Sequence, residues 1–303
     1  MCIIRTLRLL MIFWRWSRRL NLYKIPLMKF VFLSLFLMLF SFTRGQIQVN
    51  VLSEDSNLPI SYATIWLSNK VYATTDSLGF FYVDKEHLNS NFRVEATGFY
   101  SRYEYKVIKN NTIFLKEKLI ILEEVTVNLK RKKVIKETLG KLKSGNVGIV
   151  ATKDKEISRI GKFFQDNSKA NLIIDKFRFK AFSSENNRIV SVLLYSVSED
   201  GVPNEIINNE TIICKLKKGS HTSEVDLSKF NIEFPENGIF VMVNYLFLDQ
   251  NKKFSEYDPN WFFYEPSLDA ITVNEFVDTW YNVNNEWQKN EKISLSFQLL
   301  LRN

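Results

Sequence analysis

The sequence predicts an all-β protein with two antiparallel β-sandwich domains that follow an N-terminal signal segment. Composition is the first observation, because aromatic residues make up 14%, with 25 Phe, while only 10 Gly and 6 Pro occur. Phe, Tyr, Val and Ile favour strands. The second is an alternation of apolar and polar side chains that begins at Gln46 and recurs to the end of the chain. The third is that no useful stretch after Glu156 has the period of a helix.

The first 45 residues have the pattern of a targeting segment. Met28 and Lys29 begin a short basic region, residues 30–42 are apolar, and residues 43–45 (TRG) place small residues at a cleavage site. The apolar run is shorter than the ~20 residues of a transmembrane helix, so we expect a signal peptide over 28–45. An uncleaved anchor is the alternative. Residues 1–27 are interpreted as an upstream extension, with Met28 as the true start.

Charge and cysteine content restrict the function classes. Of the 41 basic residues, eight lie in residues 1–45, which leaves 33 against 33 acidic residues in the remainder. The exported part is therefore neutral, and no basic face for a nucleic acid is expected. Cys2 lies in the upstream extension, so Cys214 stands alone and no intramolecular disulfide is expected. Cys214 occupies an inward position of its predicted strand, which indicates a buried structural thiol.

The first sandwich is predicted over residues 46–128. Short alternating segments separated by turn residues predict the strands at 46–53, 61–69, 71–75, 80–83, 92–97, 102–108, 112–115 and 122–129.

A turn is predicted between the strands that end at Thr75 and begin at Phe80. Asp76 suits the first position of a type I turn, where its carboxylate accepts backbone N–H groups. Gly79 suits the fourth position or the left-handed position after it.

Residues 129–155 are rich in Lys and Arg, and we interpret them as a basic linker. A second, larger sandwich of the jelly-roll kind is predicted over residues 156–303. Its strands are expected at 176–182, 188–197, 211–217, 224–227, 230–234, 239–248 and 292–301. In the first of these, Phe177, Phe179 and Ala181 share the inward face.

Residues 46–128 resemble the carboxypeptidase regulatory-like domain. The resemblance rests on Pro59, Ile60, Ala63, Ile65, Leu67, Thr75, Asp76, Gly79, Phe81, residues 95–99 (EATGF) and residues 122–127 (LEEVTV). It implies a transthyretin-like, Ig-like sandwich without catalytic residues. It also implies an exported protein of the Bacteroidetes type, in which such domains begin secreted and TonB-linked outer-membrane proteins.

The sequence does not predict a metallopeptidase or a receptor barrel. His221 and Glu224 match an H-x-x-E ligand pair, but a catalytic zinc site needs a second His. The only other histidine, His87, lies in the first predicted domain. No nucleophile elbow or phosphate-binding loop occurs, and too little chain follows residue 129 for a TonB-type barrel.

Acidic and aromatic residues concentrate in 249–291. Paired carboxylates could serve a glycosidase or bind calcium, although solvated loop carboxylates are commoner. Aromatic side chains beside Asn and Asp could instead stack on sugars or anchor a protein partner. The candidate ligand-binding residues are Trp261, Tyr264, Trp280 and Trp287. The alternative is that these rings cap the sandwich core.

We therefore expect a non-catalytic exported protein that acts as a binding or assembly module in the periplasm, at the outer membrane or at the cell surface. An envelope protein or a glycan is the expected partner. No nucleic acid, cofactor or metal ion is expected, and membrane contact is expected only through the signal segment. The alternatives are a glycan- or peptide-directed hydrolase or accessory domain that uses the carboxylates of 249–291, and a purely structural surface protein.

Overall fold

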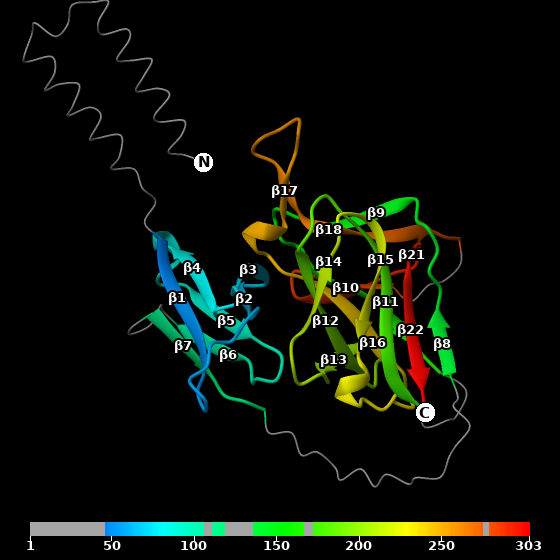
Figure 1. Ribbon diagram of the computed structural model, residues 1–303. Helices are drawn as coiled ribbons and strands as arrows, with labels where there is room; N and C mark the ends of the chain where they lie inside the picture. The colour runs from blue at the N-terminus through cyan, green and yellow to red at the C-terminus, as the bar shows by residue number, and fades with distance from the viewer. Residues whose placement is uncertain (1–45, 106–110, 119–135, 167–171, 275–278) are drawn as a thin grey trace, which may run out of the picture. The chain divides into compact units, whose positions relative to one another are not determined.

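The computed structural model describes residues 46–105, 111–118, 136–166, 172–274 and 279–303 (Figure 1). These residues form an all-β fold of several sheets, joined by loops and short 3-10 turns. Residues 47–303 make up one compact unit. The signal peptide predicted at 28–45, the extension 1–27 and the strand predicted at 122–129 lie outside the described residues.

A small sandwich of two sheets comes first in the chain. Its three-stranded sheet has the order β4-β1-β7, with β1 (Gln46–Ser53), β4 (Phe80–Asp84) and β7 (Thr112–Leu115). Its four-stranded sheet has the order β3-β2-β5-β6, with β2 (Thr64–Leu67), β3 (Lys70–Thr74), β5 (Asn91–Glu95) and β6 (Arg102–Tyr105). Buried alternate residues of these strands form one core, which includes Val51, Ile65, Phe81 and Phe92. One pair departs from the antiparallel expectation, because β1 and β7 run parallel.

The turn before β4 is built by one side chain. The Asp76 carboxylate accepts the backbone N–H groups of Leu78 (2.8 Å) and Phe80 (2.9 Å). Gly79 has φ +78°, and a Cβ there would lie 2.8 Å from the Val51 carbonyl oxygen. Glycine at this fourth position therefore allows both the left-handed backbone and the close approach of β1.

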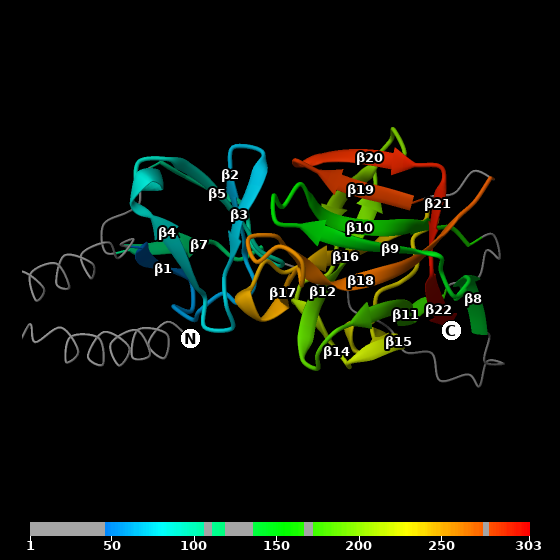
Figure 2. The same ribbon diagram turned by 90° about the horizontal axis from the view of Figure 1, so that it is seen from above.

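The larger sandwich has a seven-stranded and an eight-stranded sheet. The first has the order β13-β12-β16-β10-β19-β20, with β14 paired to β12. Figure 2 shows β19 and β20 beside β10 in this sheet. Its strands are β10 (Ile157–Phe164), β12 (Arg188–Val197), β13 (Pro203–Ile206), β14 (Ile212–Leu216), β16 (Ile239–Tyr245), β19 (Thr279–Val283) and β20 (Glu286–Asn290).

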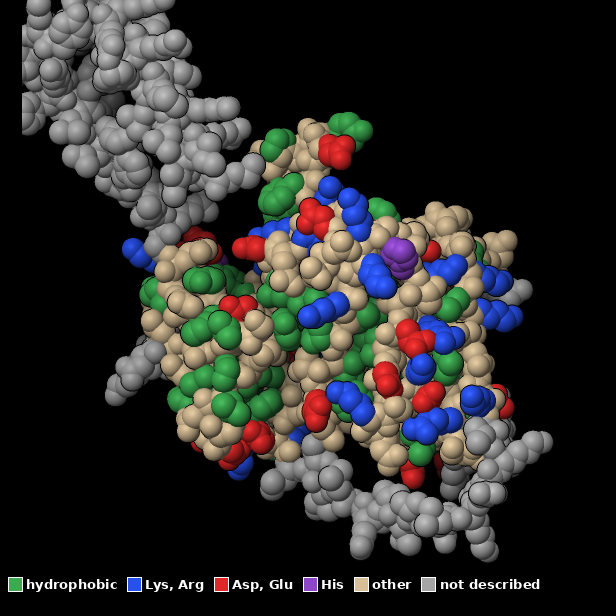
Figure 3. Space-filling model, in the orientation of Figure 1, with side chains coloured by type: hydrophobic (Ala, Val, Ile, Leu, Met, Phe, Trp, Pro, Cys, Tyr) green, Lys and Arg blue, Asp and Glu red, His purple; other side chains and the backbone are tan. Residues whose placement is uncertain are grey.

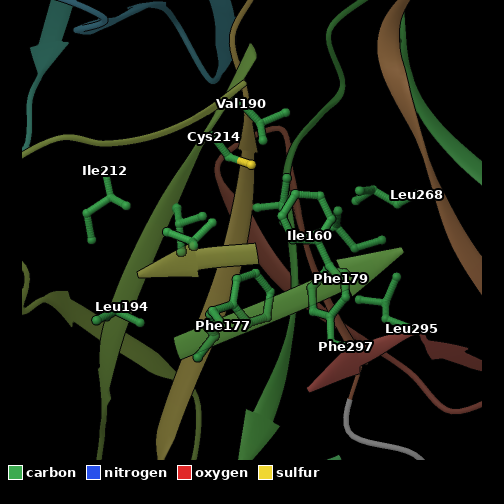
Figure 4. Packing of buried hydrophobic residues seen from close by; sticks show 14 of the residues in the cluster. Ile160, Phe177, Phe179, Val190, Leu194, Ile212, Cys214, Leu268, Leu295 and Phe297 are labelled. Atoms are coloured by element: carbon green, nitrogen blue, oxygen red, sulfur yellow. The ribbon is translucent and has the colours of Figure 1, made fainter. Parts of the chain in front are cut away.

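The second sheet has the order β17-β18-β11-β22-β8, with β15 paired to β11 and with β9 and β21 paired to β18. Its strands are β8 (Lys136–Gly140), β9 (Val147–Thr152), β11 (Ile173–Ser183), β15 (Gly219–Asp226), β17 (Lys252–Phe254), β18 (Phe262–Thr272), β21 (Ile293–Leu295) and β22 (Phe297–Arg302). Phe177 and Phe179 of β11 project toward Phe297 of β22 in the core between the sheets (Figure 4).

The interpretation of residues 129–155 as a linker is wrong for 136–152. β8 pairs with β22, and β9 pairs with β18. Basic composition concealed both strands, since β8 is an exposed edge strand that contributes only the half-buried Leu139 to the core. In β9 the buried residues are Ile149 and Ala151, at a spacing of two.

Two other predicted strands differ from the structure. The strand expected at 292–301 divides at Ser296 into β21 and β22, which pair with β18 and β11 respectively. Residues 230–234 do not form a strand, because a 3-10 turn occupies Ser228–Phe230 and only a single bridge joins Glu233 to Ile173.

Candidate binding site: an aromatic hairpin

Three of the four aromatic residues predicted to bind a ligand belong to hydrophobic clusters. Tyr264 is 2% exposed and packs edge-on against Phe247, with ring centroids 4.8 Å apart. Burial raises the pKa of the Tyr264 hydroxyl far above its usual value. Its role is therefore to fill the core.

Trp280 and Trp287 are half-buried on the face of the seven-stranded sheet that points away from the core between the two sheets. Trp280 packs edge-on against Phe240 (5.5 Å) and Trp287 packs against Tyr195 (5.3 Å). Together with Leu193 and Met242 they form a second hydrophobic cluster, separate from the core between the sheets. The structure does not bring these two rings together with Trp261 in one binding face.

Trp261 lies in an exposed hairpin, residues 252–264, that joins β17 to β18. Trp261 is 39% exposed, and two aromatic residues that the sequence analysis did not select are more exposed, Phe254 at 55% and Tyr257 at 98%. The hairpin projects beside the β17 label in Figure 1, and Figure 3 shows hydrophobic and acidic side chains on this projection. We call these residues the aromatic hairpin.

The aromatic hairpin carries rings on both of its faces. The register pairs Phe254 with Phe262, whose rings lie 5.5 Å apart on one face. Trp261 and Phe263 share the opposite face at 5.6 Å. Adjacent strand residues point to opposite faces, so the run Trp261-Phe262-Phe263 places rings on both. This break in the alternation of apolar and polar residues is the sequence signal that could have identified the site.

Local hydrogen bonds hold the tip of the hairpin. The Asp258 carboxylate accepts the N–H of Asn260 (2.9 Å), and the Asp258 carbonyl accepts the N–H of Trp261 (3.0 Å). The Ser255 hydroxyl accepts the N–H groups of Tyr257 and Asp258, and the Ser255 N–H donates to the Trp261 carbonyl (2.9 Å). Such turns order the backbone before any ligand arrives, which reduces the entropy lost on binding.

The hairpin has acids at its tip and lysines at its base. Glu256 and Asp258 flank Tyr257 and are exposed, and no salt bridge to either is found among the described residues. At the base, Lys252 pairs with Asp249 at 2.6 Å and lies over the Phe262 ring at 5.2 Å.

The carboxylates of 249–291 lie in different surroundings. Glu265 is buried, ion-paired with Arg188 at 3.0 Å, and accepts hydrogen bonds from the N–H and hydroxyl of Ser184. Asp258 belongs to the hairpin tip described above. A shallow hollow lined by residues 67–72 and Asn284 contains no carboxylate. Glu275 and Asp278 lie outside the described residues.

The H-x-x-E pair does not form a metal site. His221 and Glu224 lie three residues apart on β15, so they occupy opposite faces of the sheet. His221 contacts the Lys218 carbonyl (2.8 Å), and Glu224 pairs with Lys176 and Arg178, each at 2.6 Å. No group of three potential metal ligands occurs in the described part of the chain.

A buried polar centre joins the small sandwich to the larger one. Arg159 of β10 is 5% exposed, and its guanidinium lies 3.1 Å from the Glu95 carboxylate of β5. Trp66, which is 1% exposed, donates to the same carboxylate at 3.1 Å. Asn244 and Tyr195 accept further hydrogen bonds from Arg159. A cavity of about 10 Å³ beside Glu95 and Arg159 has room for about one water molecule.

Lysine and backbone contacts extend this centre. The Lys155 amine donates to the Tyr72 carbonyl and lies 5.8 Å from the Phe247 ring. The Thr74 hydroxyl accepts the backbone N–H of Phe247 at 3.1 Å. Trp66 and Val71 of the small sandwich belong to the hydrophobic core of the larger one, so the contact is apolar as well as ionic.

Comparisons with known proteins give little further information. No protein-family model matches the chain, and no curated protein matches it. One similar solved structure is that of a clostridial cysteine protease, Cwp84, after propeptide cleavage. It is 12% identical with a TM-score of 0.39, over 71% of this chain and 52% of that chain. In the described residues no helix is long and apolar enough to span a membrane.

Proposed function

We propose that the protein is an exported, non-catalytic binding or assembly module of the bacterial envelope, and that the aromatic hairpin is its ligand-contacting surface. The observation that carries the proposal is the exposure of Phe254, Tyr257 and Trp261 on one ordered hairpin. Tyr and Trp contribute most of the binding energy at many interfaces. Exposed rings that gather on a projecting segment indicate an interaction site more strongly than rings scattered singly.

The small sandwich would act as a spacer, and its resemblance to the carboxypeptidase regulatory-like domain implies that it carries no catalytic residues. Its seven described strands and its Asp76 turn are compatible with that family. The contact between Glu95 and Arg159 would hold it to the larger sandwich.

The rival functions make different predictions. A hydrolase needs two carboxylates on either side of a substrate, about 5–10 Å apart, whereas Glu265 already has a buried partner. A purely structural surface protein does not need an aromatic hairpin, so removal of these rings would leave its attachment unchanged.

A cell-fractionation experiment tests the proposal. The triple variant Phe254→Ser, Tyr257→Ser, Trp261→Ser removes the exposed rings and leaves the residues that hold the tip, because these use Ser255, Asp258 and backbone groups. We expect the wild type in the envelope fraction of the organism that encodes it and the variant in the soluble exported fraction.

The matched control is Tyr82→Ser, Tyr100→Ser, Tyr103→Ser, which removes three rings that are 54%, 52% and 65% exposed on the small sandwich. The control should fractionate like the wild type. Retention of the hairpin variant at the wild-type level would remove the hairpin from the proposal. A glycan array with residues 46–303, beside Trp261→Ala, shows whether the ligand is a glycan.

A further inference from the structure

We infer that the aromatic hairpin inserts into a concave apolar pocket of a protein partner, and that basic side chains line the rim of that pocket. The inference rests on the proposed function and names the class of ligand. It is drawn from the arrangement of the rings, from the charges at the tip and from the order of the loop.

The rings do not form a flat platform. Phe254 and Phe262 lie on one face of the ribbon with their planes inclined at 52°, and Trp261 and Phe263 lie on the other face, also at 52°. Phe262 is partly covered by the core, but Phe254 is exposed on its face and Trp261 is exposed on the other face. A sugar chain stacked on one face would therefore leave an exposed ring of the other face in water. A pocket that surrounds the hairpin covers both faces, and that is the arrangement in which hot-spot aromatics are desolvated.

The negative charges at the tip indicate that the rim of the partner's pocket is basic. Glu256 and Asp258 flank Tyr257, which is 98% exposed, so two carboxylates enter the partner together with the most exposed ring. A bilayer with anionic headgroups would repel these carboxylates. Lys or Arg at the mouth of a protein pocket would pair with them and would accelerate association.

The small contact area of the hairpin limits the expected affinity of the complex. A tip of this length covers less than the ~800 Å² per partner of a standard interface, so we expect a transient complex. Removal of a central Trp or Tyr should weaken binding about tenfold or more. Reversal of an acidic charge at the rim should reduce chiefly the association rate and its dependence on salt.

Site-specific photocrosslinking in the organism that encodes the chain would capture and identify the partner. p-Benzoylphenylalanine replaces Tyr257 at the tip, and in the control it replaces the exposed Tyr82 of the small sandwich. We expect a discrete protein adduct from position 257 that is absent from position 82. The adduct is identified by mass spectrometry and the partner is purified.

Binding of the purified partner to residues 46–303 then tests the contacts. Trp261→Ser should weaken binding at least tenfold, and Glu256→Lys should slow association severalfold at low salt. Tyr103→Ser and Glu199→Lys are exposed controls that should bind like the wild type.

Two kinds of result would overturn the inference. The first is an adduct at position 257 with lipid or glycan, or no protein adduct above the control, while the triple serine variant still leaves the envelope fraction. The proposed function would then stand and its partner class would be wrong. The second is a partner that binds Trp261→Ser and Glu256→Lys as tightly as it binds the wild type. Unchanged fractionation of the triple variant would instead remove the hairpin from the proposed function, and the inference would fail with it.

Discussion

Replacement of Glu95 by glutamine should reveal how strongly the polar centre holds the two sandwiches together. The Glu95 side chain is 16% exposed and that of Arg159 is 6% exposed, with 3.1 Å between the charged groups. Burial alone would raise the pKa of Glu95, but the charges of Arg159 and Arg93 and the hydrogen bonds from Arg159 and Trp66 together outweigh burial and hold this pKa below its usual value. Glu95→Gln keeps nearly the same shape and removes the counter-charge of a buried guanidinium.

The expected loss follows from the burial of the pair. Removing one partner of a buried ion pair costs about 3–5 kcal/mol, because the other charge remains without compensation. Arg93, which lies 4.0 Å from the Glu95 carboxylate, would then repel Arg159 without a neutralising anion between them. We therefore expect Glu95→Gln to lower the free energy of unfolding by about 3 kcal/mol.

Urea unfolding of residues 46–303 at pH 7 measures this change. The matched control is Glu224→Gln, since Glu224 also pairs with two cations, Lys176 and Arg178, but is 38% exposed. Exposed pairs contribute at most about 1 kcal/mol. The double variant Glu95→Leu, Arg159→Met should recover most of the loss, because no charge remains buried. Equal effects of Glu95→Gln and Glu224→Gln would refute the reasoning.

Three further predictions concern the described residues. Burial lowers the pKa of Lys155 from 10.5 to about 8. Between these values only the unfolded chain binds the proton, so stability should rise with pH by about 3 kcal/mol, and the difference between the wild-type and Lys155→Met urea-unfolding curves should show it. Gly161→Ala should lower the thermal midpoint well beyond Gly201→Ala: a Cβ at Gly161 would lie 2.2 Å from the Val241 carbonyl oxygen, whereas Gly201 has open space and only the strain of φ +72°. Burial raises the pKa of the Cys214 thiol to about 11, so iodoacetamide should label it in urea but not in the native protein, and native labelling at the unfolded rate would contradict the burial.

The hydrophobic pattern predicted the central strands β11, β12, β16 and β22. It did not predict β10 and β18, which are also central, because buried polar residues such as Arg159 and Glu265 interrupt their apolar pattern. β12 occupies the predicted residues 188–197, and Phe177, Phe179 and Ala181 are buried as their alternation predicts. These features depend on the spacing of side chains within a few residues, and this spacing can be read directly from the sequence. The Asp76 turn is also local, since its hydrogen bonds span only two to four residues.

Edge strands and ring exposure could not be predicted in this way. β8 has little apolar side chain of its own and becomes a strand because β22 offers it an unpaired edge. Trp261 and Trp280 occur in similar polar and aromatic surroundings in the sequence. Trp280 is partly covered because Phe240 of β16 lies beneath it, whereas Trp261 extends beyond the sheet.

The sequence by itself therefore determined the all-β class, the central strands β11, β12, β16 and β22 and the turn at Asp76, because periodicity and turn chemistry act over neighbouring residues. Only the tertiary structure decided that Glu95 meets Arg159 and that Phe254, Tyr257 and Trp261 stand together on one exposed hairpin. The physical reason is that burial and ion pairing depend on which distant strands cover a side chain. One strand's pattern carries no information about the identity of its neighbours.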